Sequence, residues 1–269
     1  MFTTVTLTPR IGTEVKADRD SLLGGAKAAE LRELLEQRGV LVFRQIHFSD
    51  KEQVAFAKTL GDVLEQGEDN IFKVTLDNKE NVIADYLRGS FYWHIDGATD
   101  DVPTRAALLG ARRLSDTGGQ TEFANTYTAY EDLPEAEQEA LSKVRVVHCF
   151  ENAQRMVTPE PSYPTLQMWQ RLVPKEHPLV WQHRSGRKSL VLCATAEHVA
   201  GMSLPEGRAL LCRLLEWATR RENVYTHEWT PDDLIIWDNT GTMHRVLPYA
   251  LDSGRMMHRT TLEGEEPLA

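Results

Sequence analysis

The sequence predicts a mainly β protein, a β-sandwich or jelly roll, with helices covering part of the strands. Two observations favour this class. Many short apolar or alternating runs of strand length lie between turn residues, and the helical patterns gather near the N-terminus and in one later insertion of helices and loops at about 150–225. The chain has 269 residues, of which 41% are hydrophobic and 26% charged, so a single domain spanning 1–269 has ample core.

The N-terminal third combines short strands with two helices. Apolar residues at helical spacing predict a helix over 26–39, with Gly39 in the position of a C-terminal cap. Ser49 as N-cap and Glu52 three residues later predict a second helix, which stops at Gly61. The strands expected here are 3–8, 40–43, 71–76 and 81–84, the last two leading to a segment around residue 94.

The rest of the chain predicts more strands and three more helices. Helices are expected over 126–133, 134–142 and 205–220, and a turn over Thr117–Gln120. Segment 151–175 contains four prolines and no clean period, so we expect a long loop with a functional role. The strands are expected at 106–111, 121–124, 144–150, 178–181, 189–193, 225–229, 234–237 and 256–262.

Composition limits the partners and the compartment. The formal net charge of −10 disfavours nucleic acid and anionic membranes as partners, but not a small anion at a locally basic site. The N-terminus lacks a signal-peptide pattern, and no apolar run approaches the roughly 20 residues that span a bilayer. We expect a cytoplasmic protein whose three cysteines are buried free thiols: Cys149, Cys193 and Cys212.

The segment Phe91–Gly97 carries the strongest chemical signal. In an extended strand His94 and Asp96 would point to the same face, giving one nitrogen ligand and one anionic oxygen ligand. A third ligand is available downstream in His244. Two His and one carboxylate form the facial triad of non-haem Fe(II) oxygenases, which leaves coordination positions open. Alone, a His-x-Asp pair is a weak signal and more often a structural contact.

An ordered set of motifs makes the signal specific. The chain resembles the Fe(II)/2-oxoglutarate dioxygenases of the taurine and 2,4-dichlorophenoxyacetate dioxygenase family from about residue 3 to residue 264. This resemblance implies a double-stranded β-helix, a cupin-like jelly roll. The motifs that carry it are His94-Ile95-Asp96, Gly118-Gly119-Gln120-Thr121, Trp237-Asp238-Asn239, Met243-His244, Arg255 and Met257-His258-Arg259, with 177–180 and 185–190 similar to the phenoxyacetate branch.

The resemblance implies a role for each matching residue. His94, Asp96 and His244 would hold Fe(II). Arg255 would form a salt bridge with the distal carboxylate of 2-oxoglutarate, and Thr121 would add a hydroxyl hydrogen bond to the same group. Arg259 matches a position where relatives use a second Arg near the acidic group of the substrate.

Elementary chemistry agrees with these two arginine roles. Arg255 and Arg259 lie four apart on one expected strand and would face the same side. Two inward guanidinium groups are costly unless anions meet them, and the planar fork of Arg suits carboxylates. The alternative is a structural salt bridge with one of the chain's acids, which is more plausible for Arg259 than for Arg255.

The expected reaction is hydroxylation or oxidative cleavage of a small organic anion, using O2 and releasing succinate and CO2. Asp96 favours hydroxylation, because related halogenases have a small residue at that position. Relatives specific for taurine carry a His in the loop that here spans 63–70, which has none, so taurine is disfavoured. Asn70, Tyr92 and the 151–175 segment would then shape a different substrate pocket.

Two other functions stay open at this point. A metal-dependent, cupin-like hydrolase or isomerase would use the same ligands without 2-oxoglutarate, but it leaves Arg255 and Thr121 unexplained. A non-catalytic ligand-binding jelly roll would keep the triad as a relic. The remaining six histidines have no partners at ligand spacing and are expected to be structural: His47, His148, His177, His183, His198 and His227. His258 is assigned a packing role, and the sequence leaves a homo-oligomer possible.

Overall fold

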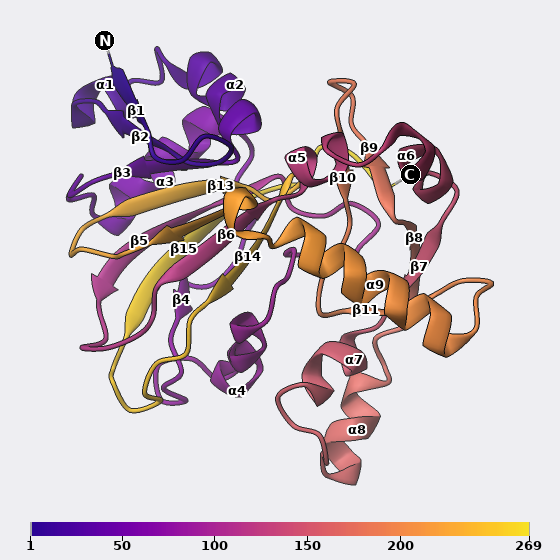
Figure 1. Cartoon of the computed structure of the whole chain (residues 1–269). Helices are drawn as coiled ribbons and strands as arrows, with labels where there is room; N and C mark the ends of the chain where they lie inside the picture. Colours follow the sequence, from indigo (N-terminus) through magenta and orange to yellow (C-terminus); the bar gives the residue numbers. More distant parts are fainter. Residues whose placement is uncertain (1, 269) are drawn as a thin grey trace.

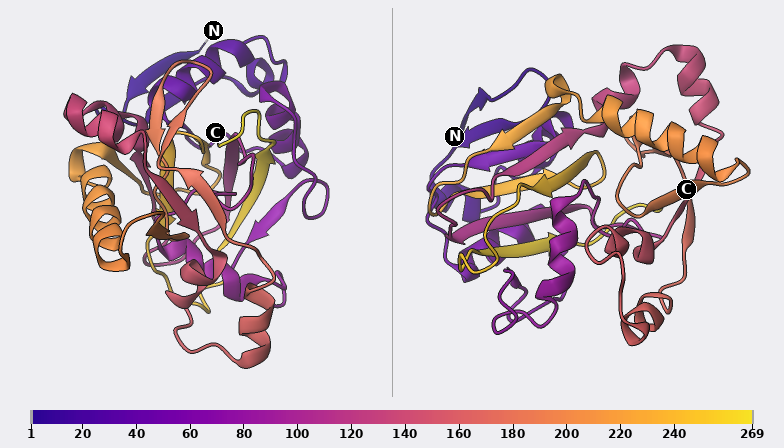
Figure 2. Two further views of the ribbon diagram at one scale, coloured as in Figure 1. Left: turned by 90° about the vertical axis from the view of Figure 1, so that its right-hand side faces the viewer. Right: turned by 60° about the horizontal axis from the view of Figure 1, so that its bottom comes forward.

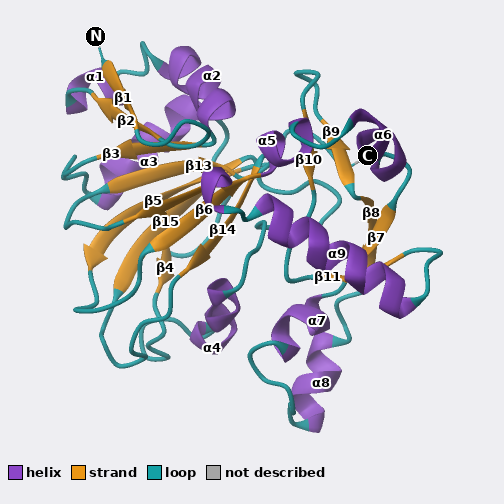
Figure 3. Cartoon of the chain, in the orientation of Figure 1, coloured by secondary structure: helices purple, strands orange, loops and turns teal. Residues whose placement is uncertain are grey.

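A seven-stranded sheet forms the centre of the computed structural model, which describes residues 2–268 (Figure 1 and Figure 3). Its order is β1-β2-β3-β13-β5-β15-β4, and β2–β3 is its one parallel pair. The strands are β1 (Thr3–Thr6), β2 (Thr13–Lys16), β3 (Val40–Phe43), β4 (Phe72–Val74), β5 (Ala106–Arg113), β13 (Leu234–Asp238) and β15 (Met256–Leu262). The expected mainly β architecture with helical cover is confirmed.

Three N-terminal helices cover one face of this sheet: α1 (Arg19–Leu23), α2 (Ala28–Arg38) and α3 (Asp50–Leu60). Leu35 of α2 and Phe56 of α3 share a buried apolar cluster with Phe43 of β3. The sequence predicted α2 and α3, and their ends follow the expected chemistry. Ser49 and Glu52 form a reciprocal capping box, and Gly39 caps α2 with a φ of 70°.

A smaller sheet of three strands, in the order β12-β6-β14, packs on the other face. It consists of β6 (Thr121–Asn125), β12 (Val224–His227) and β14 (Thr242–Val246). Phe123 and Tyr225 from this sheet share an apolar cluster with Val42, Ile235 and Met257 from the larger sheet. The two sheets therefore face each other across a continuous core.

Most of the remaining segments gather beyond one end of the two sheets (Figure 2). They contain two small sheets, one of the order β11-β7-β8 and a β9–β10 hairpin, packed with α9 around a third apolar cluster. The strands are β7 (Arg145–His148), β8 (Lys175–Pro178), β9 (Val180–Gln182), β10 (Lys188–Leu190) and β11 (Ala196–Val199). The helices are α4 (Ala84–Leu87), α5 (Thr126–Glu131), α6 (Glu135–Leu141), α7 (Phe150–Arg155), α8 (Tyr163–Trp169) and α9 (Leu204–Ala218), with 3-10 turns η1 (Arg88–Phe91) and η2 (Arg221–Asn223).

The strand expected over 81–84 is wrong. Asn81 instead makes a turn, because its Oδ1 accepts from the Ile83 amide at 3.0 Å and its Nδ2 donates to the Lys73 carbonyl at 2.6 Å. An asparagine side chain that bonds nearby main chain offers the backbone an alternative to a ladder. Helix α4 follows directly.

The long loop expected over 151–175 is also wrong, since α7 and α8 occupy about half of it. The prolines of this segment had suggested a loop. Ser162 caps α8 by accepting from the Thr165 amide, and Pro164 lies in its first turn, where a missing N–H costs nothing.

The cysteine expectation holds for two of three residues. Cys149 and Cys193 are buried free thiols, whereas Cys212 is exposed on α9. Across residues 2–268, none of the helices has both the length and the apolar character needed to cross a membrane.

The buried imidazole of His148 makes the fold sensitive to acid. Its Nδ1 lies 3.0 Å from the Thr195 hydroxyl, and its Nε2 is buried without a partner among residues 2–268. Burial, together with the neighbouring His177 ring, lowers the pKa of His148 to about 3. The unfolded chain takes up this proton below pH of about 6.5, so the free energy of unfolding should fall as the pH drops from there toward 3, by up to roughly 1.4 kcal/mol per pH unit.

Urea unfolding of the wild type and of His148→Gln at pH 7.5 and 5 measures this effect. The variant should lose less stability between the two pH values than the wild type. His47→Gln, which changes an exposed histidine, is the matched control. Equal pH dependence in wild type and His148→Gln would remove His148 as the cause.

Candidate metal centre

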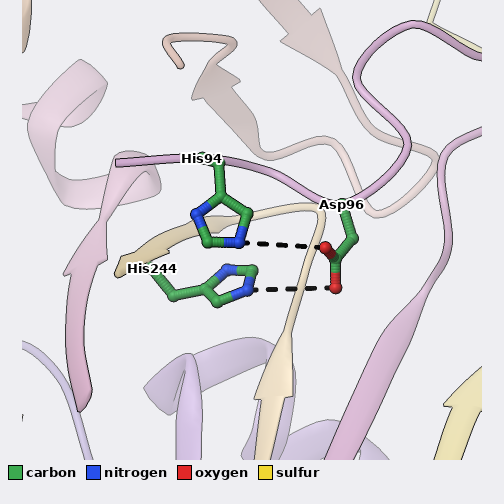
Figure 4. Close-up of side chains that lie close together, drawn as sticks. All are labelled: His94, Asp96 and His244. Atoms are coloured by element: carbon green, nitrogen blue, oxygen red, sulfur yellow. Dashed lines mark ion pairs between the residues drawn. The ribbon is translucent and has the colours of Figure 1, made fainter. Parts of the chain in front are cut away.

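The two candidate imidazoles are brought together by the main chain. His94 and His244 form an isolated β-bridge, in which each amide donates to the other's carbonyl at 3.0 and 2.9 Å. Their ring centroids are 4.0 Å apart (Figure 4). The expectation that His94 and Asp96 share an extended strand is wrong, because a turn begins at Asp96 directly after the bridge. Tertiary pairing with β14, and not strand alternation, aligns the site.

The carboxylate of Asp96 nevertheless faces both rings (Figure 4). Its Oδ1 lies 3.9 Å from His94 Nε2, and its Oδ2 lies 3.8 Å from His244 Nε2. The three ligand atoms lie within 4.8 Å of one another, and this is the one such cluster of His, Cys or acidic residues found among residues 2–268. The structure thus brings together the triad that the sequence singled out.

The protonation states suit a divalent cation. His94 Nδ1 lies 2.9 Å from the Tyr92 carbonyl, which can only accept, so Nδ1 donates there and Nε2 is the nitrogen left to bind a metal ion. Burial and the nearby His94 lower the pKa of His244 well below 6.5, which keeps it neutral. Burial alone would raise the pKa of Asp96, but Arg259, His244 and His94 together lower it to about 2. Two neutral nitrogens and one anionic oxygen match the donor set of a facial triad.

A buried guanidinium lies beside the Gly118-Gly119 turn. Arg255 is 3% exposed, donates to the Gly119 carbonyl at 3.1 Å, and has a buried Nε with no partner among residues 2–268. A Cβ at Gly119 would lie 2.9 Å from that Nε, so glycine is needed for this approach. Burial lowers the pKa of Arg255, as expected for a cation that an anion has yet to neutralise.

Thr121 completes the polar wall on β6. It is 4% exposed and accepts from Trp229 Nε1 at 2.9 Å, which leaves its own hydroxyl proton free to donate. Arg255 and Thr121 offer a charged and a neutral donor, a pair that suits a carboxylate.

The second arginine contacts the triad directly. Arg259 donates to Asp96 Oδ2 at 3.0 Å, and its guanidinium carbon lies 5.0 Å from the Phe72 ring centre. Its Nε is buried without a partner among residues 2–268. The expectation that both arginines lie on one strand is wrong for Arg255, which precedes β15. The pairing register of β15 with β5 also shifts between Met256 and Met257. Arg259 is thus partly paired within the site.

The other expected substrate residues lie in different places. Tyr92 donates from its hydroxyl to the Met156 carbonyl at 2.8 Å, which connects the triad segment to the residue that follows α7. Asn70 lines a cavity of about 680 Å³ with His258 and residues of α3, on the face of β15 opposite to Arg259. His258 is more than a packing residue, because its Nδ1 lies 2.8 Å from Asp50.

Sequence reasoning missed several residues around the site. Asn239 bonds the main chain of Asp96, and the Tyr249 ring lies 4.9 Å from the Arg255 guanidinium carbon. Asn239 stood in a recognised motif without an assigned role, whereas Tyr249 and Phe72 gave no sequence signal. Their parts become visible only once the strands are in place.

Comparisons with known proteins agree with this chemistry. Residues 3–261 match the family described as "Taurine catabolism dioxygenase TauD, TfdA family". The chain is 34% identical to an alpha-ketoglutarate-dependent 2,4-dichlorophenoxyacetate dioxygenase of Cupriavidus pinatubonensis, over 91% of each chain. It is 32% identical to an alkylsulfatase of Acinetobacter baylyi, over 96% of this chain and 84% of that protein. The crystal structure of AAD-2 in complex with Mn(II) and N-oxalylglycine matches it with a TM-score of 0.86, 32% identity and 100% coverage of both chains.

Proposed function

Because this chain belongs to the TauD, TfdA family of dioxygenases, we propose a role for each residue of its site and a class of substrate. The chain is a 2-oxoglutarate-dependent dioxygenase that uses Fe(II), O2 and a small-molecule substrate. The hydrolase or isomerase alternative and the non-catalytic jelly roll are thereby set aside.

We infer that His94, Asp96 and His244 hold the iron. Fe(II) held by these residues would supply the O2 chemistry that couples oxidation of the substrate to decarboxylation of 2-oxoglutarate into succinate and CO2. The protein's part is positional. The bridge between His94 and His244 fixes two nitrogens, and the Tyr92 carbonyl orients the His94 ring so that Nε2 faces the ion.

Arg255 and Thr121 are proposed to bind the distal carboxylate of 2-oxoglutarate. The observation that supports this is the buried guanidinium whose Nε has no partner among residues 2–268; the Thr121 hydroxyl keeps a proton to donate. A cation buried in this way is stabilised when a carboxylate reaches it.

The substrate is proposed to be an organic anion held by Arg259. This guanidinium lies against Asp96, so a group bound to its remaining N–H donors would lie beside the iron. The relatives named above act, by their names, on 2,4-dichlorophenoxyacetate and on alkyl sulfates, both apolar bodies with an acidic head. Tyr92 and α7–α8 stay predicted contributors to the rest of the pocket, whereas Asn70 lines the cavity on the opposite face of β15.

A screen for succinate release tests this assignment. Aryloxy acids, alkyl sulfates, sulfonates and carboxylates are incubated with Fe(II), 2-oxoglutarate and O2. Arg259→Ala should raise the KM for the accepted anion roughly 10- to 100-fold, because a hydrogen bond to a charged group contributes about 1.5–3 kcal/mol. Arg113→Ala, on an exposed end of β5, is the control. Unchanged turnover of the true substrate by Arg259→Ala would reject the anion role.

We also propose the finer architecture implied by the family. Successive strands alternate between the two facing sheets on either side of the insertion: β5 and β6 before it, then β12, β13, β14 and β15 after it, with β5, β13 and β15 in the larger sheet and β6, β12 and β14 in the smaller. This alternation supports a double-stranded β-helix carrying a helical insertion at about 150–225 within a single domain. A cytoplasmic location and a homo-oligomer stay predictions.

A further inference from the structure

The three side chains of the metal centre are held in place by two different devices. His94 and His244 are fixed to each other by reciprocal main-chain hydrogen bonds. Asp96 lies outside this bridge and is the first residue of a turn. Gly97, the second residue of the turn, has a φ of 75°. Something other than a strand ladder must therefore hold the carboxylate ligand against the two rings.

The side chain of Asn239 fixes the main chain of Asp96. Its Oδ1 accepts from the Asp96 amide at 3.0 Å, and its Nδ2 donates to the Asp96 carbonyl at 2.8 Å. The same Nδ2 lies 2.9 Å from the Thr104 carbonyl and 3.0 Å from its hydroxyl. Both ends of the loop 96–104 thus meet on one fully buried amide.

Asn239 is itself held by its neighbours in the chain. Its amide donates to the Arg105 carbonyl at 3.1 Å, and the preceding Asp238 carboxylate receives Arg105 at 2.6 Å. An amide side chain is required here, because it combines an acceptor with two donors in one plane. A carboxylate would place a second oxygen against the carbonyls of Asp96 and Thr104. An apolar group would remove the partner of four polar atoms, which are the amide and carbonyl of Asp96 and the carbonyl and hydroxyl of Thr104.

We propose that Asn239 is a positioning residue that sets the Asp96 carboxylate in register with His94 and His244 and thereby determines metal affinity. The segment Asn239–His244 then aligns the whole site, since one end clamps the acidic ligand and the other supplies an imidazole and its bridge. This inference rests on the proposed role of the triad. Groups that support a metal ligand in this way typically change metal affinity 10- to 100-fold when they are removed.

The test is Mn(II) binding by the metal-free full chain, followed through the EPR signal of free Mn(II) and without 2-oxoglutarate. Asn239→Ala should weaken Mn(II) binding 10- to 100-fold. Asn239→Asp keeps the shape of the side chain and the acceptor for the Asp96 amide, and it should weaken Mn(II) binding at least 10-fold. This variant tests the proposal if Asn239→Ala does not fold. Thermal unfolding of each metal-free variant separates lost affinity from lost stability.

Asn125→Ala is the matched control. Asn125 is also fully buried and also joins two segments, donating to the Arg10 carbonyl and accepting from the Thr128 amide. It should lose stability but keep Mn(II) affinity within twofold. Wild-type affinity in folded Asn239→Ala or Asn239→Asp, or an equal loss in Asn125→Ala, overturns the positioning role. Absence of Mn(II) and Fe(II) binding by the wild type would instead overturn the proposed metal centre.

Discussion

Replacing Arg255 by alanine is expected to raise the 2-oxoglutarate concentration for half-maximal succinate release by roughly 100- to 1000-fold. The guanidinium is buried, contacts the Gly119 carbonyl, and has an Nε without a partner among residues 2–268. Truncating one member of a buried charged pair costs about 2–5 kcal/mol, which is roughly 30- to 4000-fold, and the expected loss lies in the middle of that range. Titration of succinate release with 2-oxoglutarate at saturating Fe(II) measures the change.

The affinity for the metal distinguishes this role from a structural one. Mn(II) binding without 2-oxoglutarate should be unchanged in Arg255→Ala, because no triad residue contacts the guanidinium in the described hydrogen bonds. Arg255→Met should leave the metal-free protein at least as stable as the wild type, since it removes a buried cation that no anion neutralises. Arg112→Ala is the control, because that guanidinium pairs with Asp50 on the α3 side of the larger sheet. A collapse of metal affinity would show that Arg255 supports the triad instead.

The residues of the site were easier to predict than the elements that carry them. His94, Asp96 and His244 were found because ligand chemistry restricts residue types, and the order of several motifs made the assignment specific. The strand reasoning behind them failed, since Asp96 lies in a turn and the His94–His244 bridge joins segments 150 positions apart (244 − 94 = 150). The hydrophobic periodicity of a local segment carries no information about a pairing between distant residues.

The errors in the fold share a cause. Asn81 and Pro164 each belong to a residue type with two structural uses, and the hydrogen bonds formed by nearby residues decide between them. Asn81 makes a turn because the Lys73 carbonyl is within its reach, and Pro164 begins α8 because Ser162 caps the helix. The same limit hid Asn239, whose function depends on where loop 96–104 closes.

Replacing Asp96 by asparagine is expected to weaken Mn(II) and Fe(II) binding by at least 100-fold and to abolish substrate-dependent succinate release. The loss should exceed the 10- to 100-fold typical of residues that only support a ligand, because the site's one anionic donor is removed. The amide keeps the shape of the side chain, so packing is not the cause. Asp101→Asn, a highly exposed carboxylate in the same loop, should bind metal normally.

The metal-free form of Asp96→Asn provides a second, independent measurement. Arg259 loses its carboxylate partner at 3.0 Å, and Asp96, with a pKa lowered to about 2, no longer contributes its charge. A carboxyl with a lowered pKa stabilises the folded chain above its ordinary pKa and loses that contribution as the pH falls through the lowered value. The variant should therefore unfold more readily than the wild type at pH 7, by roughly 2 kcal/mol, and the difference should shrink from pH 4 toward pH 2. Equal stability at pH 7 would mean that Arg259 and Asp96 are not coupled, and that the guanidinium proposed to bind the substrate is not held in place through the carboxylate of the triad.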